Sequence, residues 1–471
     1  MAEPGTANVV SLSEILVARA RQAFVSIPGE VRQAARLHIL DALGVAVLGA
    51  GKGPLRGLQD RLPPAPGAAT VLGSSQRMSP PMAALVNGAY LHSLEYDDTH
   101  VASVMHGSST VLPAALAAAE QFAGNGADFV AAYTIGWEVL IRFGLAAPGS
   151  LQARGFQTTS AAGPFAAALV STLLDGDADI SQAALGIAGM QPGGTFAFLA
   201  DGDTTKAVQP GWAALSGLMA ADLARAGVTG PKGVLDGPYG FFKLYADDEG
   251  AAVRMREQVE TLGVDWLLPD AAFKLIPCCH FIHPFVQALQ ELVHDGLRAA
   301  DIASLTCHVP TGAAPIIAEP WPAKQRPATP HDARWSLPYV LAAVLADGAV
   351  SVDLFTEPIG GERAAYASRM RYVAWPDSGF PERFPARLEV LTTDGRRLTR
   401  QVDDVRGAPG HPISTAEVIA KADDNMRSGG VSAAGRKRVV AEIIHASDPD
   451  LIAILDPLRG DASGRARAEN R

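Results

Sequence analysis

Apolar residues recur at three- and four-residue spacing from Leu12 to about Leu262, with Gly and Pro between the periodic stretches. This period is typical of amphipathic helices, and no convincing strand alternation interrupts it. The pattern predicts helices at roughly 12–25, 30–49, 81–95, 109–123, 128–145, 160–174, 181–189 and 206–226. We therefore expect a large all-helical domain over the first half of the chain.

The pattern changes after Pro269. Residues 302–309 alternate like a strand, and residues 387–402 are typical of a hairpin that turns at Thr393-Asp394-Gly395-Arg396. A Pro-rich stretch, 310–330, precedes an expected helix at 333–346, and helical periodicity returns at roughly 415–428 and 433–447. These patterns indicate a second unit that contains both strands and a helix, followed by further helices.

Together these elements predict a mainly α protein with a large helical domain and a smaller α/β domain. We expect the first helical segment in residues 1–267, the smaller α/β domain in 268–410, and C-terminal helices in 411–471 that return to the helical domain. A chain of 471 residues exceeds the usual size of one hydrophobic core, which agrees with two domains.

Composition narrows the possible partners. Hydrophobic residues make up 48% and charged residues 19%, which is typical of a folded enzyme. A net charge of -10 argues against binding to nucleic acid or to an anionic membrane, since both require a basic surface. The first residues have no basic region leading into an apolar run, so we expect a cytoplasmic protein.

The cysteines exclude several kinds of chemistry. Only Cys278, Cys279 and Cys307 occur, and this spacing fits neither a disulfide framework nor a CxxC metal or iron–sulfur site. No phosphate-binding loop, GxSxG elbow or dinucleotide fingerprint is present. We therefore expect no metal and no cofactor, and a reaction carried out by side-chain acids and bases.

The densest polar cluster is Glu95-Tyr96-Asp97-Asp98-Thr99-His100, followed by His106. Acids, a hydroxyl and imidazoles at helix ends are typical of groups with adjusted pKa values that donate and accept protons. Helix capping and a surface loop are the alternative interpretation. Two Asp and two His could also bind a metal, but no further ligand cluster supports that hypothesis.

Two lysines and a tyrosine are further candidate site residues. Lys206 stands before a small-residue helix, where it can face a carboxylate or be solvated. Lys274 opens a segment that contains His280 and His283 at the change of pattern, and such junctions often carry active sites. Tyr339 stands at a helix start, with a packed aromatic as its alternative role.

These motifs resemble, in order and spacing, the MmgE/PrpD family. The resemblance rests on the segments 37–44, 96–100, 206–214, 274–284 and 336–339. The family includes 2-methylcitrate dehydratase, cis-aconitate decarboxylase and iminodisuccinate epimerase. The resemblance implies a helical domain built from both ends of the chain, an inserted lid, a homodimer, and an active site between the domains.

The resemblance also implies roles for individual residues. Lys206 and Lys274 would bind substrate carboxylates and stabilise an enediolate, while His106 would carry the proton. Tyr339, Asp97, Asp98 and Thr99 would orient the substrate, protonate a leaving hydroxyl or fix the His106 tautomer. The remaining substrate-binding candidates are Glu95, Gln157, His280 and His283.

Two glutamines depart from the family pattern. Gln157 and Gln209 stand where many relatives carry His, and an amide is neither a general acid nor a base. Our first hypothesis is a cofactor-independent hydro-lyase that dehydrates a citrate-like polycarboxylate. The alternatives are an epimerase of a dicarboxylate such as iminodisuccinate, which Gln157 favours, a cis-aconitate-type decarboxylase, and a non-catalytic polycarboxylate-binding homologue.

Overall fold

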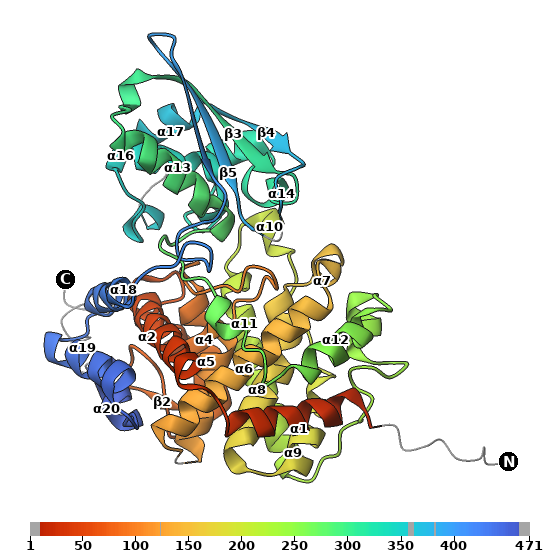
Figure 1. Cartoon of the computed structure of the whole chain (residues 1–471). Helices are drawn as coiled ribbons and strands as arrows, with labels where there is room; N and C mark the ends of the chain where they lie inside the picture. The colour runs from red at the N-terminus through yellow and green to blue at the C-terminus, as the bar shows by residue number, and fades with distance from the viewer. Residues whose placement is uncertain (1–9, 123, 357–361, 381–382, 461–471) are drawn as a thin grey trace.

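The computed structural model describes residues 10–122, 124–356, 362–380 and 383–460. It consists of a helical body and a smaller helix–sheet unit that stands on it, as Figure 1 shows. We call the unit formed by residues 276–402 the lid. The predicted fold class, mainly α with a smaller α/β part, is confirmed.

Helices make up almost all of the helical body. From the N-terminal part come α1 (Leu12–Phe24), α2 (Gly29–Lys52), α3 (Leu58–Arg61), α4 (Pro80–His92), α5 (Ser108–Gln121), α6 (Gly126–Ala146), α7 (Ser150–Ala153), α8 (Thr158–Asp175), α9 (Ala178–Ala188), α10 (Phe198–Asp201), α11 (Thr205–Arg225) and α12 (Ala251–Glu260). A short antiparallel pair, β1 (Ala69–Thr70) and β2 (Arg77–Met78), joins them. The eight predicted helices begin and end within about three residues of observed ones, whereas the short helices α3, α7 and α10 and the longer α12 were not predicted.

The chain returns to the helical body at its C-terminal end. Helix α18 (Thr415–Ser428) packs on α2, and α19 (Ala433–Val440) and α20 (Leu451–Leu455) follow it; Figure 1 shows these three helices in blue on the side of the helical body where the red α2 lies. Buried Met426, Val439 and Ile454 belong to the same core as Leu43 of α2. The last predicted helix is shorter than expected, because after Val440 the chain continues as a π turn.

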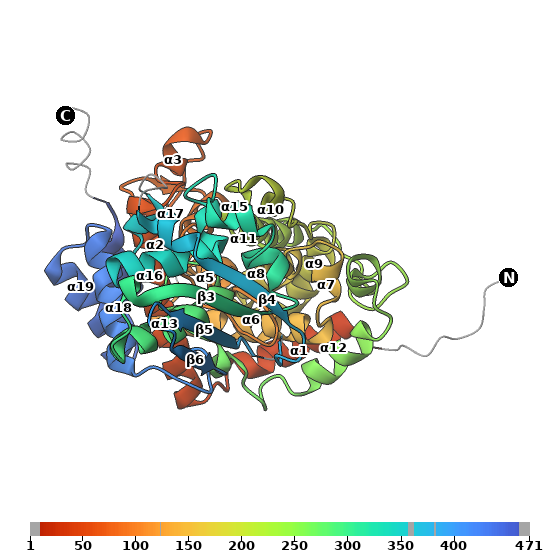
Figure 2. The same cartoon turned by 90° about the horizontal axis from the view of Figure 1, so that it is seen from above.

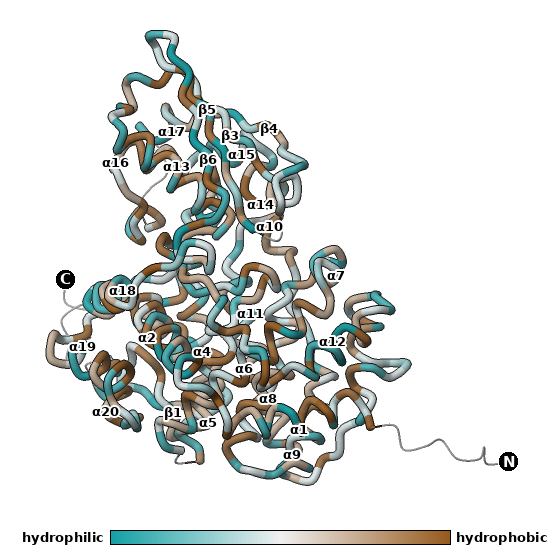
Figure 3. The backbone as a smooth tube through the Cα atoms, in the orientation of Figure 1, coloured by the Kyte–Doolittle hydropathy of each residue, from teal (hydrophilic) through white to brown (hydrophobic). Residues whose placement is uncertain are grey.

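The lid has its own apolar core around a four-stranded sheet. Its elements are α13 (His283–His294), β3 (Ile302–Pro310), α14 (Ala314–Ile317), α15 (Trp321–Gln325), α16 (Leu337–Asp347), α17 (Glu362–Ala367), β4 (Met370–Trp375), β5 (Ala386–Thr392) and β6 (Arg397–Val402). Brown, apolar segments run through both the lid and the helical body in Figure 3.

Short 3-10 or π turns occur in both parts of the molecule. They lie at 242–246, 268–270, 280–282, 299–301, 332–335, 353–355, 441–445 and 456–458.

The sheet has the order β4-β3-β5-β6. The predicted hairpin is present as the antiparallel pair β5–β6, while β4 runs parallel to β3 and was not predicted. Strand β4 is a half-exposed edge strand, so it lacks a clear apolar alternation. Helix α13 packs on β5 and β6, and Figure 2 looks down on this layer above the helical body.

The helix expected at 333–346 begins later, at Leu337. Residues Asp332–Trp335 form a 3-10 turn instead. Ser336 then caps α16, because its hydroxyl accepts a hydrogen bond from the Tyr339 amide at 3.2 Å.

Two helices, α2 and α6, are long and apolar enough to cross a membrane. In the folded chain, however, 72% of the most apolar window of α2 and 94% of that of α6 are buried. Core helices of this length satisfy the same composition test, so these segments carry no argument for a membrane span.

Close packing of α11 on α4 fixes the start of α11. A Cβ added at Gly211 would clash with the carbonyl oxygen of Leu85, so the two helix backbones approach at a position that tolerates only Gly. We expect Gly211→Ala to reduce the free energy of unfolding by about 1–3 kcal/mol, as overpacked cores do. Gly29→Ala is the control, since a Cβ there meets nothing within 4 Å.

Equilibrium urea unfolding of both variants measures this difference. An unchanged unfolding midpoint for Gly211→Ala would show that α11 and α4 separate at little cost in free energy.

Candidate active site

A cavity of about 550 Å³ lies between the helical body and the lid. The helical body contributes polar side chains from the segment 95–106, from the start of α8 and from the start of α11. The lid and the connection through α10 contribute mostly apolar and aromatic groups. These are Phe196, Phe198, Leu199, Phe281, Pro315, Ile316, Trp335, Phe380 and Phe384. The cavity is therefore largely apolar, and we call the part lined by Glu95, His106, Lys206 and Lys274 its polar end.

Glu95 is paired with both predicted lysines at the polar end. Lys206 Nζ donates to Glu95 Oε1, and Lys274 Nζ lies 3.5 Å from Glu95 Oε2 and 3.2 Å from the Glu95 carbonyl oxygen. Burial acts against ionisation of Glu95, but the two ammonium groups hold its pKa well below the usual range. The carboxylate therefore fixes two cations side by side.

Lys274 keeps its charge although its side chain is 0% exposed. Burial alone would lower its pKa, but the charges of Glu95 and Asp97 raise the pKa above the ordinary value. Lys274 makes two hydrogen bonds to Glu95 and Lys206 makes one. Since an ammonium group has three N–H donors, each lysine has at least one left for an anion in the cavity.

The backbone of this segment is unusual. Glu95 has φ 53° and Val104 has φ 53°, a left-handed conformation that is uncommon for residues with a Cβ and an outlier for Val. Both residues line the cavity. Strained backbone of this kind clusters at functional sites, where the surrounding packing maintains it.

His106 lines the same end of the cavity and belongs to a chain of polar groups. Its Nδ1 lies 3.2 Å from Thr99 Oγ1 and 3.5 Å from Asp97 Oδ2, and Asp97 Oδ2 is 2.8 Å from His92 Nδ1. Burial would raise the pKa of Asp97, but the imidazoles of His92 and His106 hold it well below its usual range. The ionised carboxylate therefore orients the His106 ring.

The pKa of His106 itself is lowered to about 4. Burial is the largest cause, and the positive charges of Lys274 and Lys206 add to it, against the opposing effect of Asp97. The imidazole is therefore neutral near pH 7. With Nδ1 turned to Asp97 and Thr99, the other ring nitrogen remains for a ligand.

Gln157 and His280 complete the predicted residues on the cavity wall. Gln157 caps α8, because its Oε1 accepts from the Ser160 amide at 2.6 Å, and this leaves its amide NH₂ for a ligand. His280 is buried, and neither ring nitrogen has a hydrogen-bond partner among the described residues. Burial, His283 and Lys274 lower the pKa of His280 well below its usual range, so it is a neutral donor and acceptor.

Other predicted site residues do not line the cavity. Asp98 turns the opposite way from Asp97, and its Oδ2 is 2.7 Å from His38 Nδ1 and 2.6 Å from the Ser108 hydroxyl. Tyr339 is buried in the lid core. Both residues therefore have structural positions, unlike the direct roles that the sequence suggested.

His283 and Gln209 also lie off the cavity wall. The ring of His283 meets the ring of His280 edge-on, with 4.8 Å between their centroids. His283 therefore supports a wall residue instead of forming the wall. Gln209 Nε2 donates a hydrogen bond to the Thr195 carbonyl oxygen at 2.9 Å, so its amide binds the backbone of that segment.

The site does not favour a reactive cysteine. Cys279 lines the cavity, but burial and Glu95 raise the pKa of its thiol to about 11, which disfavours a thiolate.

The charges at the site also disfavour a metal ion. Among the described residues, His92, Asp97 and His106 offer possible metal-ligand atoms within 4.8 Å of one another. Lys206 and Lys274 lie next to this group, and their charges oppose a further cation.

Sequence reasoning missed His92 and the aromatic wall. His92 ends α4, and its position there gives no sign that it would contact Asp97. Trp335 lines the cavity with Lys206 Nζ 5.3 Å from its ring centroid. Apolar and aromatic residues carry no chemical motif, so only the fold reveals that they shape the cavity.

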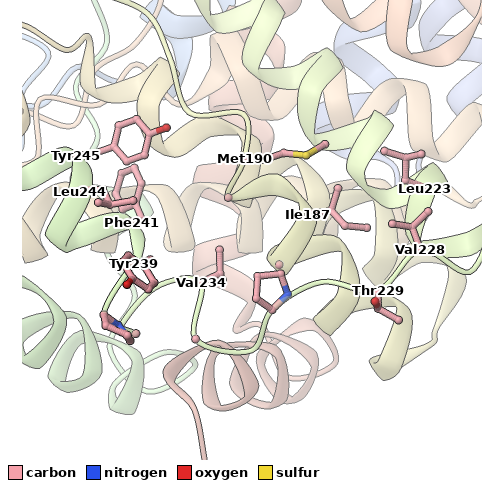
Figure 4. Close-up of a pocket in the computed structure, with 16 residues that line it drawn as sticks. Ile187, Met190, Leu223, Val228, Thr229, Val234, Tyr239, Phe241, Leu244 and Tyr245 are labelled. Atoms are coloured by element: carbon pink, nitrogen blue, oxygen red, sulfur yellow. The ribbon is translucent and has the colours of Figure 1, made fainter.

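A different hollow, of about 510 Å³, lies on the helical body near α9 and the loop before α12. Figure 4 shows its apolar lining, including Ile187, Met190, Leu223, Val234 and Phe241. Its lining residues include two tyrosines but no Asp, Glu, His, Lys or Arg. It therefore lacks the acids, bases and cations of the cavity between body and lid.

Two family models match most of the chain. The family model described as MmgE/PrpD N-terminal domain matches residues 18–254, and the model described as MmgE/PrpD C-terminal domain matches residues 276–446. The cis-aconitate decarboxylase-like protein oryM of Aspergillus oryzae is 33% identical over 349 residues, which cover 70% of this chain and 72% of that protein.

Named cis-aconitate decarboxylases are similar over a comparable share of the chain. Cis-aconitate decarboxylase of Aspergillus terreus is 32% identical over 349 residues, covering 70% of this chain and 71% of that protein. The protein of the same name from Homo sapiens is 29% identical over 375 residues, covering 75% and 74%.

Proposed function

Because the chain belongs to the MmgE/PrpD family, we propose that it is a lyase that decarboxylates a small unsaturated tricarboxylate such as cis-aconitate. The observation that carries this proposal is the pair of buried lysines beside His106 at the polar end of one cavity. The names of similar proteins favour decarboxylation over the dehydration that we first expected.

The chemistry of the substrate matches this arrangement. In cis-aconitate one carboxylate is carried on a CH₂ group next to the C=C bond. Loss of that carboxylate as CO₂ breaks the C–C bond, and its electron pair forms a new C=C bond. The pair of the old C=C bond moves to the carbon beside the distal carboxylate, where it is shared with that carboxylate as an enediolate. Protonation of this carbon gives methylenesuccinate.

The residues at the polar end have distinct roles in this scheme. Lys274 and Lys206 bind the retained carboxylates and stabilise the enediolate, since fixed charges act strongly in a cavity shielded from water. His106 delivers the proton to carbon, and Asp97 with Thr99 holds its ring. His280 and the Gln157 amide are further donors to a carboxylate. Gln157 need not act as a base, because only one proton moves.

The direct test is incubation of EDTA-treated protein with cis-aconitate in D₂O, with products analysed by NMR. We expect CO₂ and methylenesuccinate in equal amounts, with one deuterium in the saturated CH₂ group. EDTA should not change the rate, because every step uses side chains.

Parallel incubations separate the alternatives. Water loss from 2-methylcitrate without CO₂ from cis-aconitate would contradict the proposal and assign a hydro-lyase. Deuterium exchange into iminodisuccinate alone would assign an epimerase. Thermal stabilisation by these polycarboxylates without any turnover would assign a binding protein.

A further inference from the structure

A second polar cavity, of about 590 Å³, lies on another part of the junction between helical body and lid. It shares no lining residue with the candidate active site. Its wall comes from the end of α2 and the turn after it, from the turn before α11, and from lid segments 329–334 and 355–356. Three parts of the chain that are far apart in sequence therefore enclose it.

The cavity is lined by cations. Lys52, Arg56 and Arg334 line it, and no Asp or Glu is among its lining residues. Carboxylates outside the lining also act on these cations: Asp353 is 2.9 Å from Lys52 Nζ across the junction, and the charge of Glu95 acts on Arg334. The lining itself carries three cations and no carboxylate, and this net positive charge favours an anion.

Arg334 is a fixed part of this wall. It is 2% exposed, and its Nη1 donates to the carbonyl oxygens of Leu94 at 2.8 Å and Pro277 at 2.9 Å. Its guanidinium lies over the Phe355 ring, 4.5 Å from the centroid. Its Nε–H has no hydrogen-bond partner among the described residues. The guanidinium is thus fixed in position, and its Nε–H is a donor for a ligand.

Buried His331 also indicates that this cavity holds a ligand. It lines the cavity and is 7% exposed, yet neither of its ring nitrogens has a hydrogen-bond partner among the described residues. A buried polar group without a partner is destabilising, so an occupant that accepts a hydrogen bond from the ring would recover free energy. Burial lowers the pKa of His331 to about 4, which leaves one ring N–H to donate.

We propose that this cavity is a second anion site, separate from the candidate active site, which binds a small oxyanion such as a phosphate or a carboxylate group. His331, Arg334 and Arg56 are the donors, and Lys52 adds charge. Such a ligand bridges the helical body and the lid. The proposal does not depend on the reaction that the chain catalyses.

The site is linked to the active-site cavity through shared segments. The rings of His331 and Trp335 meet edge-on, 4.7 Å apart, and Trp335 lines the active-site cavity. The Leu94 carbonyl that Arg334 holds precedes Glu95, and Thr204 is the residue before α11, which carries Lys206. Occupancy therefore stabilises the segments that carry the active-site ion pair.

Equilibrium dialysis with radiolabelled inorganic phosphate at pH 7 tests the proposal on the full chain. We expect saturable binding of one phosphate per chain that persists in Lys274→Met, which alters the active-site cavity. Arg56→Gln and His331→Leu should each weaken this binding by about tenfold, the effect of losing one charged or buried hydrogen bond. Arg56 is exposed, so its variant is expected to fold.

Arg427→Gln is the matched control, since it removes an exposed arginine of α18 that does not line the cavity. Absence of saturable binding overturns the proposal. It is also overturned if Lys274→Met abolishes phosphate binding while Arg56→Gln leaves it unchanged. Competition by unlabelled citrate in the Lys274→Met background would assign the site to carboxylates as well, and lack of competition would restrict it to phosphate.

Discussion

Lys274→Met is expected to lower kcat/KM for cis-aconitate by about 100- to 1,000-fold, the usual effect of removing one donor to a developing anion. The ammonium of Lys274 is fully buried and charged, and its two hydrogen bonds to Glu95 leave one N–H for the enediolate. Met keeps most of the side-chain volume, so the cavity keeps its shape. Steady-state kinetics measures the change.

The same variant has a defined structural consequence. Glu95 keeps its partner Lys206 in Lys274→Met, so the carboxylate is not left unpaired. The control is Lys437→Met, which removes an exposed lysine of α19 and should leave kcat/KM unchanged. If Lys274→Met retained the wild-type kcat/KM while Lys206→Met lost it, Lys206 alone would stabilise the enediolate.

His106→Gln is expected to lower kcat by about 100- to 10,000-fold, the range of general acid catalysis. Gln donates a hydrogen bond but cannot release a proton to carbon. The variant should therefore bind cis-aconitate while releasing CO₂ slowly. Rates of CO₂ release and NMR of the product in D₂O measure the change, with His411→Gln as the control at an exposed histidine.

The pH dependence of this step follows from the charges around His106. Its pKa is lowered to about 4 in the empty cavity by burial and the two lysines. A bound tricarboxylate brings negative charge, which raises the pKa of His106, so binding near pH 7 takes up a proton. The proton is lost again as the pH rises through the raised pKa, and kcat should fall there.

Calorimetry of ligand binding in buffers with different ionisation enthalpies measures this uptake. We expect about one proton in the wild type at pH 6 to 7 and none in His106→Gln. Equal uptake in both proteins would show that another group, such as His280, carries the proton.

The sequence predicted the helical elements well because their apolar period is strong. The ends of α1 and α11 lie within about one residue of the prediction, whereas β4 was missed because an edge strand buries few side chains. The predicted boundaries of the domains at residues 268 and 411 remain predictions. The observed return of α18 to α2 is compatible with them.

The site was predicted in part. Glu95, Thr99, His106, Lys206 and Lys274 line one cavity, although Lys206 and Lys274 lie 111 and 179 residues from Glu95 in the chain. The side chains of Asp98 and Tyr339 are equally suited to acid–base chemistry. However, Asp98 turns to His38, and Tyr339 is buried in the lid core. A residue type indicates what a side chain can do and leaves its direction open.

The sequence by itself determined the elements and the chemical inventory of this protein. Periodicity fixes which residues face a core, and composition fixes which acids, bases and cations are available. Only the tertiary structure decided that Glu95 holds two lysines together and that the pKa of His106 is lowered. Both depend on burial and on charges brought together from distant segments, which no local pattern records.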